Sequence, residues 1–323
     1  MKSRIVAALS LALMMVQAHA QDPFPSKPVT VINPNAPGGM SDIIARGMQD
    51  SLRRSFKQPV AVVGRVGAGG AVGGAFVAKA PADGYTLLLN TVTHVLIPIT
   101  EAALGRPLPY AVDDLTLISR VTADPLLLVV HTSLPVKTVN EFVALAKKRP
   151  GDISYSSSGM YASGHIAMEL LSRVTGINTL HSPYNGAGPA MIAVLGGHTM
   201  ATFAPAGVVS PHISSGRVRL LGQTGPRRAA ALPQTPTLKE AGYDAELTLW
   251  AGYFAPAKTP PAILKTWQAA IREGADDPHF KAAMAKINVT VDFLDGDALQ
   301  AWYADELKRL NRDVRSIGKI EGR

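Results

Sequence analysis

A short loop rich in glycine and small polar residues could bind an anion. It runs from Pro34 to Asp42 with the sequence PNAPGGMSD, between a predicted strand and a predicted helix. Backbone N–H groups at a helix N-terminus lack partners within the helix, and the helix dipole adds partial positive charge there. Gly38 and Gly39 let the backbone approach a ligand because they have no Cβ. The alternative is an ordinary strand-to-helix turn in which Ser41 or Asp42 only caps the helix.

A second loop repeats this pattern in the other half of the chain. It runs from Tyr155 to His165 with the sequence YSSSGMYASGH, follows a predicted strand and leads into a predicted helix. Its four serines and two glycines supply many small hydrogen-bond donors. Capping is again the alternative, but two such loops would let a cleft hold a carboxylate from both sides.

A third glycine tract, from Gly64 to Gly74, suggests a dinucleotide site but does not fit one. The G-x-G-x-x-G pattern that starts at Gly67 requires glycine where Val72 stands, and the chain has no phosphate-loop G-K-[ST]. We therefore expect the tract to serve close packing of helix against strand.

The residues that could carry catalysis or bind a metal are scattered. Seven histidines follow residue 20, yet none forms an H-E-x-x-H pair, and cysteine is absent. The serines between Ser156 and Ser163 lack the G-x-S-x-G context of a hydrolase nucleophile. We expect His165, at a helix start, to be a cap or ligand donor rather than a general base. The sequence predicts no enzyme, no cofactor and no metal, with an exported serine hydrolase as the remote alternative.

Short β-branched runs alternate with helical patterns, which predicts an α/β fold with parallel strands joined by crossover helices. Strands are expected at 29–33, 60–63, 85–90, 126–130 and 153–156. Without a low-complexity linker, two domains would be joined by strands that cross between them, around 123–125 and 247–252.

The length and charge of the chain limit its class. The 323 residues less a 20-residue export signal leave 323 − 20 = 303, enough for one large domain or two of about 150. The formal net charge of +8 favours anionic ligands. Runs of basic residues are short and aromatic residues make up only 6%, so the footprint of a nucleic-acid binder is missing.

The N-terminus reads as a cleaved export signal. Lys2 and Arg4 precede an apolar stretch from Ile5 to Val16, and Ala18-His19-Ala20 supplies the small residues that a signal peptidase reads. The alternative, a membrane anchor, would need more than about 12 apolar residues to span the bilayer. The absence of cysteine excludes a lipid-modified cysteine, so we expect a soluble periplasmic protein.

A series of short motifs follows in a fixed order along the chain. They are Pro25-Ser26-Lys27-Pro28, Pro37-Gly38-Gly39 with Ser41-Asp42, Gly67-Ala68-Gly69-Gly70, 78–87, Tyr155-Ser156-Ser157-Ser158-Gly159 with His165, Pro183-Tyr184 with Gly186, Leu195-Gly196-Gly197, and Pro233-Gln234-Thr235-Pro236-Thr237 with Glu240-Ala241-Gly242. In this order the motifs resemble the Bug family, the periplasmic solute-binding receptors of tripartite tricarboxylate transporters. The resemblance covers essentially the whole mature chain.

The resemblance implies an α/β, two-domain Venus-flytrap fold of the type II-like periplasmic binding proteins, each domain a sheet flanked by helices. We expect a signal peptide at 1–20, domain 1 at 21–123 plus 250–323, and domain 2 at 124–249. It implies a monomeric receptor that captures a small-molecule carboxylate for the membrane permease subunits. A receptor that senses a carboxylate for signalling is the alternative.

The resemblance also implies that the two loops hold the ligand, largely through main-chain groups. Thr91 and His94 fall where the family lines its cleft, and Tyr184 matches the family's cleft tyrosine. Trp250 is a further candidate, although a buried hinge aromatic is an equal reading. The full set of expected ligand-binding residues is Asn35, Ala36, Pro37, Gly38, Gly39, Met40, Ser41, Asp42, Thr91, His94, Ser158, Gly159, Met160, Ser163, His165, Tyr184, Ala204 and Trp250.

Departures from the family pattern bear on the ligand. Relatives that bind acidic amino acids carry an Asp where this chain reads Phe203-Ala204-Pro205-Ala206, so an ammonium group would stay unpaired. Met40, Met160 and Tyr161 add polarizable and aromatic surface beside the loops, or serve packing. We expect a di- or tricarboxylate, with an aromatic dicarboxylate such as a phthalate isomer as one candidate.

Overall fold

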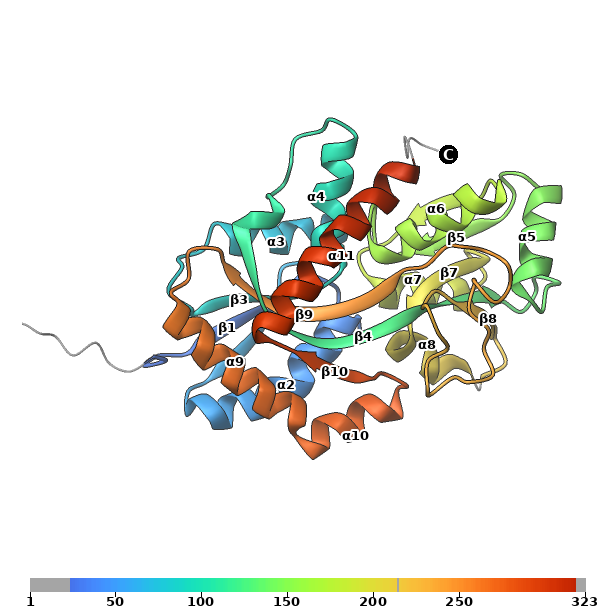
Figure 1. The fold of residues 1–323 in the computed structure, drawn as a ribbon. Coiled ribbons are helices and arrows are strands. Elements are labelled where there is room, and N and C mark those ends of the chain that lie inside the picture. Colours follow the sequence, from blue (N-terminus) through green and yellow to red (C-terminus); the bar gives the residue numbers. More distant parts are fainter. Residues whose placement is uncertain (1–23, 214, 318–323) are drawn as a thin grey trace, which may run out of the picture.

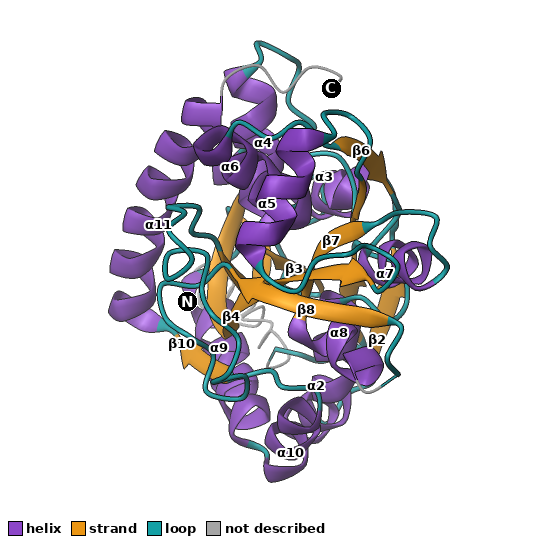
Figure 2. Cartoon of the chain, turned by 90° about the vertical axis from the view of Figure 1, so that its right-hand side faces the viewer, coloured by secondary structure: helices purple, strands orange, loops and turns teal. Residues whose placement is uncertain are grey.

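The computed structural model describes residues 24–213 and 215–317, which fold into two α/β lobes (Figure 1). The expected signal peptide lies outside these residues. Within them, the strands follow the order β2-β1-β3-β9-β4-β7-β5-β6, and β8 and β10 also pair with β4. Figure 2 shows the strands enclosed by helices. In the described part of the chain, no helix is long and apolar enough to cross a membrane.

Lobe 1 is built around three parallel strands, with β1 paired to both β2 and β3. Strand β9 then pairs antiparallel with β3. Its elements are β1 (Val29–Asn33), α2 (Met40–Phe56), β2 (Val60–Gly64), the 3-10 turn η1 (Ala68–Gly70), α3 (Ala71–Ala78), β3 (Thr86–Thr91), α4 (Thr93–Ala103), η2 (Val112–Asp114), α9 (Pro261–Asp276), α10 (Pro278–Lys286), β10 (Val291–Leu294) and α11 (Gly296–Ile317).

Lobe 2 repeats the plan with β5 parallel to β6 and β7. Its elements are α5 (Val139–Lys148), β5 (Ser154–Ser157), α6 (Ser163–Thr175), β6 (Leu180–Pro183), α7 (Ala187–Leu195), β7 (Ala201–Pro205), α8 (Ala206–Ile213) and β8 (Val218–Gln223). The Thr138 side chain caps α5 by accepting from Glu141 N at 3.1 Å.

Two long strands belong to both lobes. Strand β4 (Leu115–His131) pairs with β9 and β10 through its first half, and with β7 and β8 through its second half. Strand β9 (Thr248–Pro256) pairs with β4 across the junction, where Asp124 lies opposite Leu249. The lobes are therefore connected by the strands themselves, while the exact domain boundaries stay a prediction.

The sheet differs from the sequence prediction in three respects. Strands β6, β8 and β10 were not predicted. The prediction of parallel strands was incomplete, because β9 runs antiparallel to both of its neighbours. The first half of β4 was missed because polar residues interrupt its apolar pattern. One of them is Arg120, which is buried by an ion pair with Asp292 and by the ring of Trp302. A buried polar side chain with partners looks like a loop residue in sequence.

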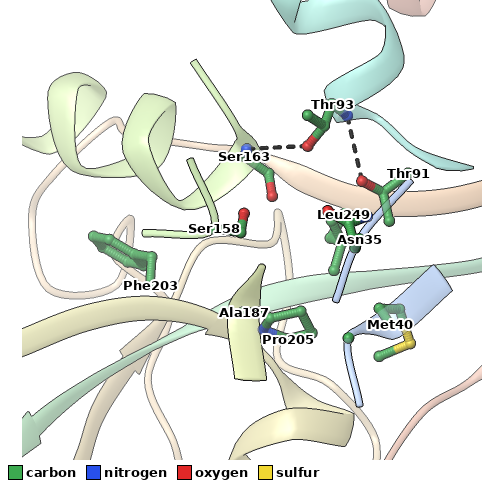
Figure 3. A pocket seen from close by; sticks show the side chains of 11 residues that line it. Asn35, Met40, Thr91, Thr93, Ser158, Ser163, Ala187, Phe203, Pro205 and Leu249 are labelled. Carbon is green, nitrogen blue, oxygen red and sulfur yellow. Dashed lines mark hydrogen bonds between the residues drawn. The ribbon is translucent and has the colours of Figure 1, made fainter. Parts of the chain in front are cut away.

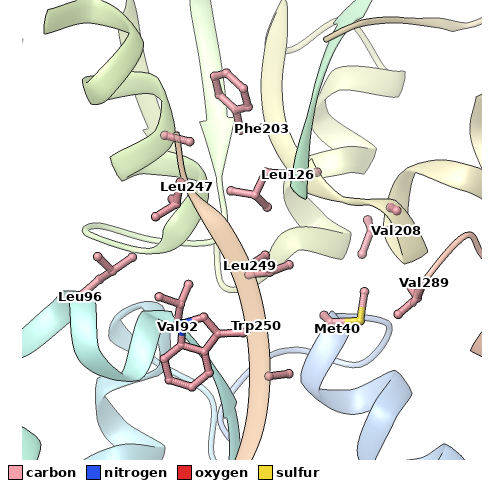
Figure 4. Close-up of a cluster of buried hydrophobic side chains, with 14 of the residues drawn as sticks. Met40, Val92, Leu96, Leu126, Phe203, Val208, Leu247, Leu249, Trp250 and Val289 are labelled. Carbon is pink, nitrogen blue, oxygen red and sulfur yellow. The ribbon is translucent and has the colours of Figure 1, made fainter. Parts of the chain in front are cut away.

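One continuous hydrophobic core runs through both lobes and the junction. Figure 4 shows this core where β9 passes from one lobe to the other. Leu126, Leu249 and Phe203 lie toward lobe 2, and Val92, Trp250 and Met40 lie toward lobe 1. Helix α11 runs diagonally across the face of the molecule that is turned toward the viewer in Figure 1, and Glu306 of this helix accepts a hydrogen bond of 3.1 Å from Trp250 Nε1. Leu299, Leu310 and Val314 of this helix are buried in the core.

Candidate functional site

A small pocket lies where the two lobes meet (Figure 3). Only about 20 Å³ of it is open to the centre of a water molecule, which is room for about one water. Four side chains that line it carry hydroxyl groups, and Asn35 carries an amide. The lining residues are Asn35, Gly39, Met40, Thr91, Thr93, Ser158, Ser163, Ala187, Phe203, Pro205 and Leu249.

The first loop is held by its own side chains. Asn33 Oδ1 accepts from Ser41 Oγ at 2.8 Å, and Ser41 Oγ accepts from Asn35 Nδ2 at 2.9 Å. The buried Asp42 carboxylate accepts from Asn33 Nδ2 at 3.0 Å, from Gly38 N at 3.1 Å and from Arg46 Nε at 2.8 Å. The side chains of Ser41 and Asp42 therefore stabilise the loop, and neither residue is the N-cap of helix α2.

Helix α2 begins without a side-chain cap. Gly39 is the N-cap residue, and its own N–H bonds to Ala36 O at 3.1 Å. The N–H groups of Met40, Ser41 and Asp42 form the first turn and have no carbonyl four residues earlier within the helix. Because Gly39 and Met40 line the pocket, this uncapped terminus is at its edge.

The second loop is held by the buried His165 and the half-buried His181. Ser157 Oγ lies 2.7 Å from His181 Nε2, and His165 Nδ1 accepts from Tyr161 N at 2.9 Å. The two imidazole rings stack with 4.0 Å between centroids and 7° between planes. Because Nδ1 of His165 accepts, its proton is on Nε2.

Both imidazoles are neutral because charging them inside the protein is costly. Burial, with a smaller contribution from the nearby His181, lowers the pKa of His165 to about 3. Burial likewise lowers the pKa of His181 to about 4. These histidines support the second loop from behind and supply no positive charge to the pocket.

Helix α6 also begins without a side-chain cap, and Ala162 is its N-cap residue. Its first N–H, that of Ser163, donates to Thr93 Oγ1 of lobe 1 at 3.2 Å (Figure 3). Ser158 Oγ and Ser163 Oγ have no hydrogen bond to another described residue, and both residues line the pocket. The pocket is thus edged by one uncapped helix terminus from each lobe and by free hydroxyl groups.

The two lobes touch around this pocket. A Cβ at Gly159 would lie 2.5 Å from Gly69 Cα, so the second loop meets η1 backbone to backbone. A Cβ at Gly186 would lie 3.2 Å from Ala36 N. Gly69 of the third glycine tract thus contacts lobe 2. Within lobe 1, a Cβ at Gly73 of α3 would lie 2.7 Å from Pro34 Cβ, directly after β1.

The structure brings six of the eighteen expected site residues together in the pocket lining. They are Asn35, Gly39, Met40, Thr91, Ser158 and Ser163. Seven more belong to the same two loops without lining the pocket. They are Ala36, Pro37, Gly38, Ser41, Asp42, Gly159 and Met160.

The other five lie away from the lining. His94 is buried against Tyr110 and Phe254, and burial lowers its pKa to about 3. Trp250 packs on α11, and His165 packs behind the second loop. Tyr184 braces that loop by donating its N–H to Ser157 O at 3.0 Å, while Ala204 is buried in β7 between two lining residues.

Five lining residues were not predicted from sequence: Thr93, Ala187, Phe203, Pro205 and Leu249. Leu249 and Trp250 are consecutive in β9, and successive side chains of a strand point to opposite faces. We expected Trp250, whose side chain lies on the opposite face of the strand from the pocket; its neighbour Leu249 lines the pocket. Thr93 and Ala187 each begin a helix, which is the signal that could have found them.

The pocket lining contains no charged side chain. Asp42, which belongs to the first loop, is paired with Arg46 on its far side. No group of three or more His, Cys, Asp or Glu that could hold a metal occurs among the residues that the structure describes. Chemically, the arrangement can donate hydrogen bonds to an anion from neutral groups and can surround its apolar part with Met40, Phe203 and Leu249.

Two α/β lobes joined by crossing strands around one shared pocket define a two-lobed solute-binding receptor. Residues 44–319 match the family described as the tripartite tricarboxylate transporter family receptor, TctC, and the chain belongs to this family. The resemblance to the Bug family is confirmed. The chain is a solute-binding receptor and not an enzyme.

Relatives match over nearly the full length. A Cupriavidus necator protein described as the UPF0065 protein in the gbd 5' region is 32% identical over 97% of this chain and 94% of its own. Protein BugT of Bordetella pertussis is 33% identical over 92% of this chain and 91% of its own.

Solved structures share the fold. The periplasmic binding protein BugD has a TM-score of 0.83 at 29% identity, covering 91% of this chain and 99% of its own. MatC of Rhodopseudomonas palustris, solved with bound malate, has a TM-score of 0.83 at 25% identity, covering 90% and 100%. An R. palustris protein solved with adipate has a TM-score of 0.82 at 27% identity, covering 91% and 98%. The predicted α/β fold is thereby confirmed.

Proposed function

We propose that this chain is a monomeric periplasmic receptor that captures an organic di- or tricarboxylate and delivers it to the permease of a tripartite tricarboxylate transporter. The observation that carries the proposal is the pocket between the uncapped N-termini of α2 and α6, edged by free hydroxyl groups and by no charged side chain. The family supports the permease partner, and the malate and adipate of the two R. palustris structures support the ligand class.

Binding would replace the water around a carboxylate with neutral donors of the protein. The N–H groups at each helix terminus and the hydroxyls of Ser158 and Ser163 donate, and Asn35 has a second N–H besides the one bound to Ser41. Thr93 Oγ1 already accepts from Ser163 N, so a carboxylate oxygen would compete with this hydroxyl for the first N–H of α6.

A di- or tricarboxylate needs more room than the pocket has when the lobes touch as they do here. We therefore infer that the lobes separate for entry and close on the bound acid with a wider spacing between the loops. Of the residues that favoured an aromatic acid, only Met40 lines the pocket, whereas Met160 and Tyr161 do not. Aliphatic acids are accordingly the first choice, and an aromatic dicarboxylate is the second.

Calorimetric titration tests the proposal. The ligands are malate, adipate, citrate and phthalate, with glutamate and glucose as comparisons. We expect at least one carboxylate to bind, and Gly39→Val to weaken it at least about tenfold, because its Cβ would lie 3.2 Å from Ala36 O at the pocket edge. Gly64→Val is the control, since a Cβ at Gly64 meets nothing within 4 Å. Binding of glucose alone, or equal affinity of both variants, would reject the proposal.

Osmotic-shock fractionation checks the periplasmic location.

A further inference from the structure

Tyr161 occupies a backbone conformation that needs support from outside its own loop. Its φ is 61°, in the left-handed region that L side chains rarely adopt. Residues hold such conformations when the surrounding structure over-determines them. Within lobe 2, the support is the bond from Tyr161 N to His165 Nδ1 and the stacking of the two rings at 5.8 Å.

The remaining support for Tyr161 comes from lobe 1. Its ring is 4% exposed and packs in a small apolar cluster with Ala71 of α3 and with Ile97 and Leu104, at α4. Its hydroxyl oxygen accepts from Arg106 Nη1, in the turn that follows α4. A side chain from the second loop is thus inserted between two helices of the opposite lobe.

These contacts exist only while the lobes touch. A separation of the lobes would withdraw the Tyr161 ring from α3 and α4, break its bond to Arg106 and expose apolar surface. The bond from Ser163 N to Thr93 Oγ1, two residues further along the loop, would break with it. Besides the backbone contact of Gly159 with Gly69, the second loop therefore makes two further contacts with lobe 1, one polar at the pocket and one mainly apolar outside it.

We propose that Tyr161 and Arg106 form a latch between the lobes that sets the fraction of closed receptor. Neither residue lines the pocket, so the latch acts on the equilibrium between open and closed lobes and not on the ligand. Its effect on closure rests on the structure alone, and only its effect on affinity rests on the proposed function. A device that stabilises the closed form raises affinity most where the ligand-free receptor is mainly open.

Single-molecule energy transfer tests the latch without any ligand. Because the chain lacks cysteine, Asp50→Cys in α2 and Lys147→Cys in α5 give one exposed dye site on each lobe. Arg106→Ala removes the partner from lobe 1 and leaves the second loop unchanged, and Tyr161→Phe removes only the hydroxyl. We expect each variant to lower the ratio of closed to open molecules about tenfold, as for a hydrogen bond to a charged group. The double variant should add little to the larger single effect.

Arg53→Ala is the matched control, since Arg53 is an exposed arginine of lobe 1 whose ion pair is with Asp50 of the same helix. Its dye pair uses Gln49→Cys in place of Asp50→Cys. Closed fractions that are the same in Arg106→Ala, Tyr161→Phe and wild type would overturn the latch, and so would equal shifts in the Arg53→Ala control. Failure of every carboxylate to bind would reject the proposed function while leaving this measurement intact.

Discussion

The two loops at the pocket are built in opposite ways. The first is a closed network within lobe 1, in which Asn33, Asn35, Ser41 and Asp42 bond to one another. The second depends on its own His165, on the half-buried His181 of β6 and, across the pocket, on lobe 1. The first loop is thus ready before closure, whereas the second reaches its full set of contacts only when the lobes meet. The first loop is preorganised, whereas the second loop completes its contacts only in the closed form.

The largest effect should come from blocking the approach of the second loop. Gly159→Ala places a Cβ 2.5 Å from Gly69 Cα, where only backbone could give way. We expect affinity for the carboxylate to fall more than about a hundredfold in calorimetry, because closure is prevented. Gly151→Ala is the control, since φ is also positive there and its Cβ meets nothing.

A misfolded Gly159→Ala would be uninformative, so Gly69→Ala approaches the same contact from lobe 1. Its Cβ would lie 3.0 Å from Met160 O. Wild-type affinity in a folded Gly69→Ala or Gly159→Ala protein would show that the second loop binds without closure, and the contrast between the loops would fail.

The next effect concerns the first loop. Asp42→Ala removes the acceptor of the buried Asn33 Nδ2 as well as that of Gly38 N. We expect the free energy of unfolding in urea to fall by about 2 kcal/mol, because a buried donor is left unpaired. Asp50→Ala, at an exposed ion pair of the same helix, should change it by no more than about 0.5 kcal/mol. Equal effects of the two variants would mean that the network does not hold the loop.

The last prediction concerns pH, where the effects of two groups partly cancel. The pKa of His165 is lowered to about 3 from 6.5, so the folded protein binds fewer protons than the unfolded chain below pH 6.5. Its contribution to stability is complete above pH 6.5 and is lost as pH falls toward 3. The slope is at most about 1.4 kcal/mol per pH unit. Asp124, whose pKa burial raises to about 6, acts in the opposite direction between pH 4 and 6.

Urea unfolding at pH 7.5 and pH 5 measures this slope, and His165→Gln should flatten it. Hydrogen-exchange protection at pH 5 should fall in the second loop and hold in the first, because only the second rests on histidines. The same pH dependence in His165→Gln and wild type would assign the acid sensitivity to other groups.

Sequence periodicity was sufficient for the α/β class, for strand β1 from Val29 to Asn33, and for the position of both loops. Periodicity did not predict which face of each helix or strand points toward the pocket. Thr93 and His94 are neighbours in α4, yet one lines the pocket and the other is buried against Phe254. Which of two consecutive residues faces the pocket depends on how the helix or strand is rotated against distant partners, and local pattern does not contain this.

The roles of polar residues were also hidden in the sequence. Ser41 and Asp42 have the types of a helix cap or a ligand donor, but their side chains are occupied by Asn33, which lies in the preceding strand. Several hydrogen-bond partners are within reach of such a hydroxyl or carboxylate, and the three-dimensional structure decides which of them it binds. The Tyr161 contact with α3 and α4 joins segments far apart in the chain and leaves no periodic trace.

The pairing of β3 with β9 has a consequence for biosynthesis. Leu88 lies opposite Phe254, a separation of 254 − 88 = 166 residues, and Trp250 of β9 then bonds to Glu306 in the final helix. A ribosome delivers the N-terminal part first, so the nascent sheet keeps an unfinished apolar edge until almost the entire polypeptide has emerged. Such an edge is a natural target for holding chaperones, and the native state is reached only after synthesis is nearly complete.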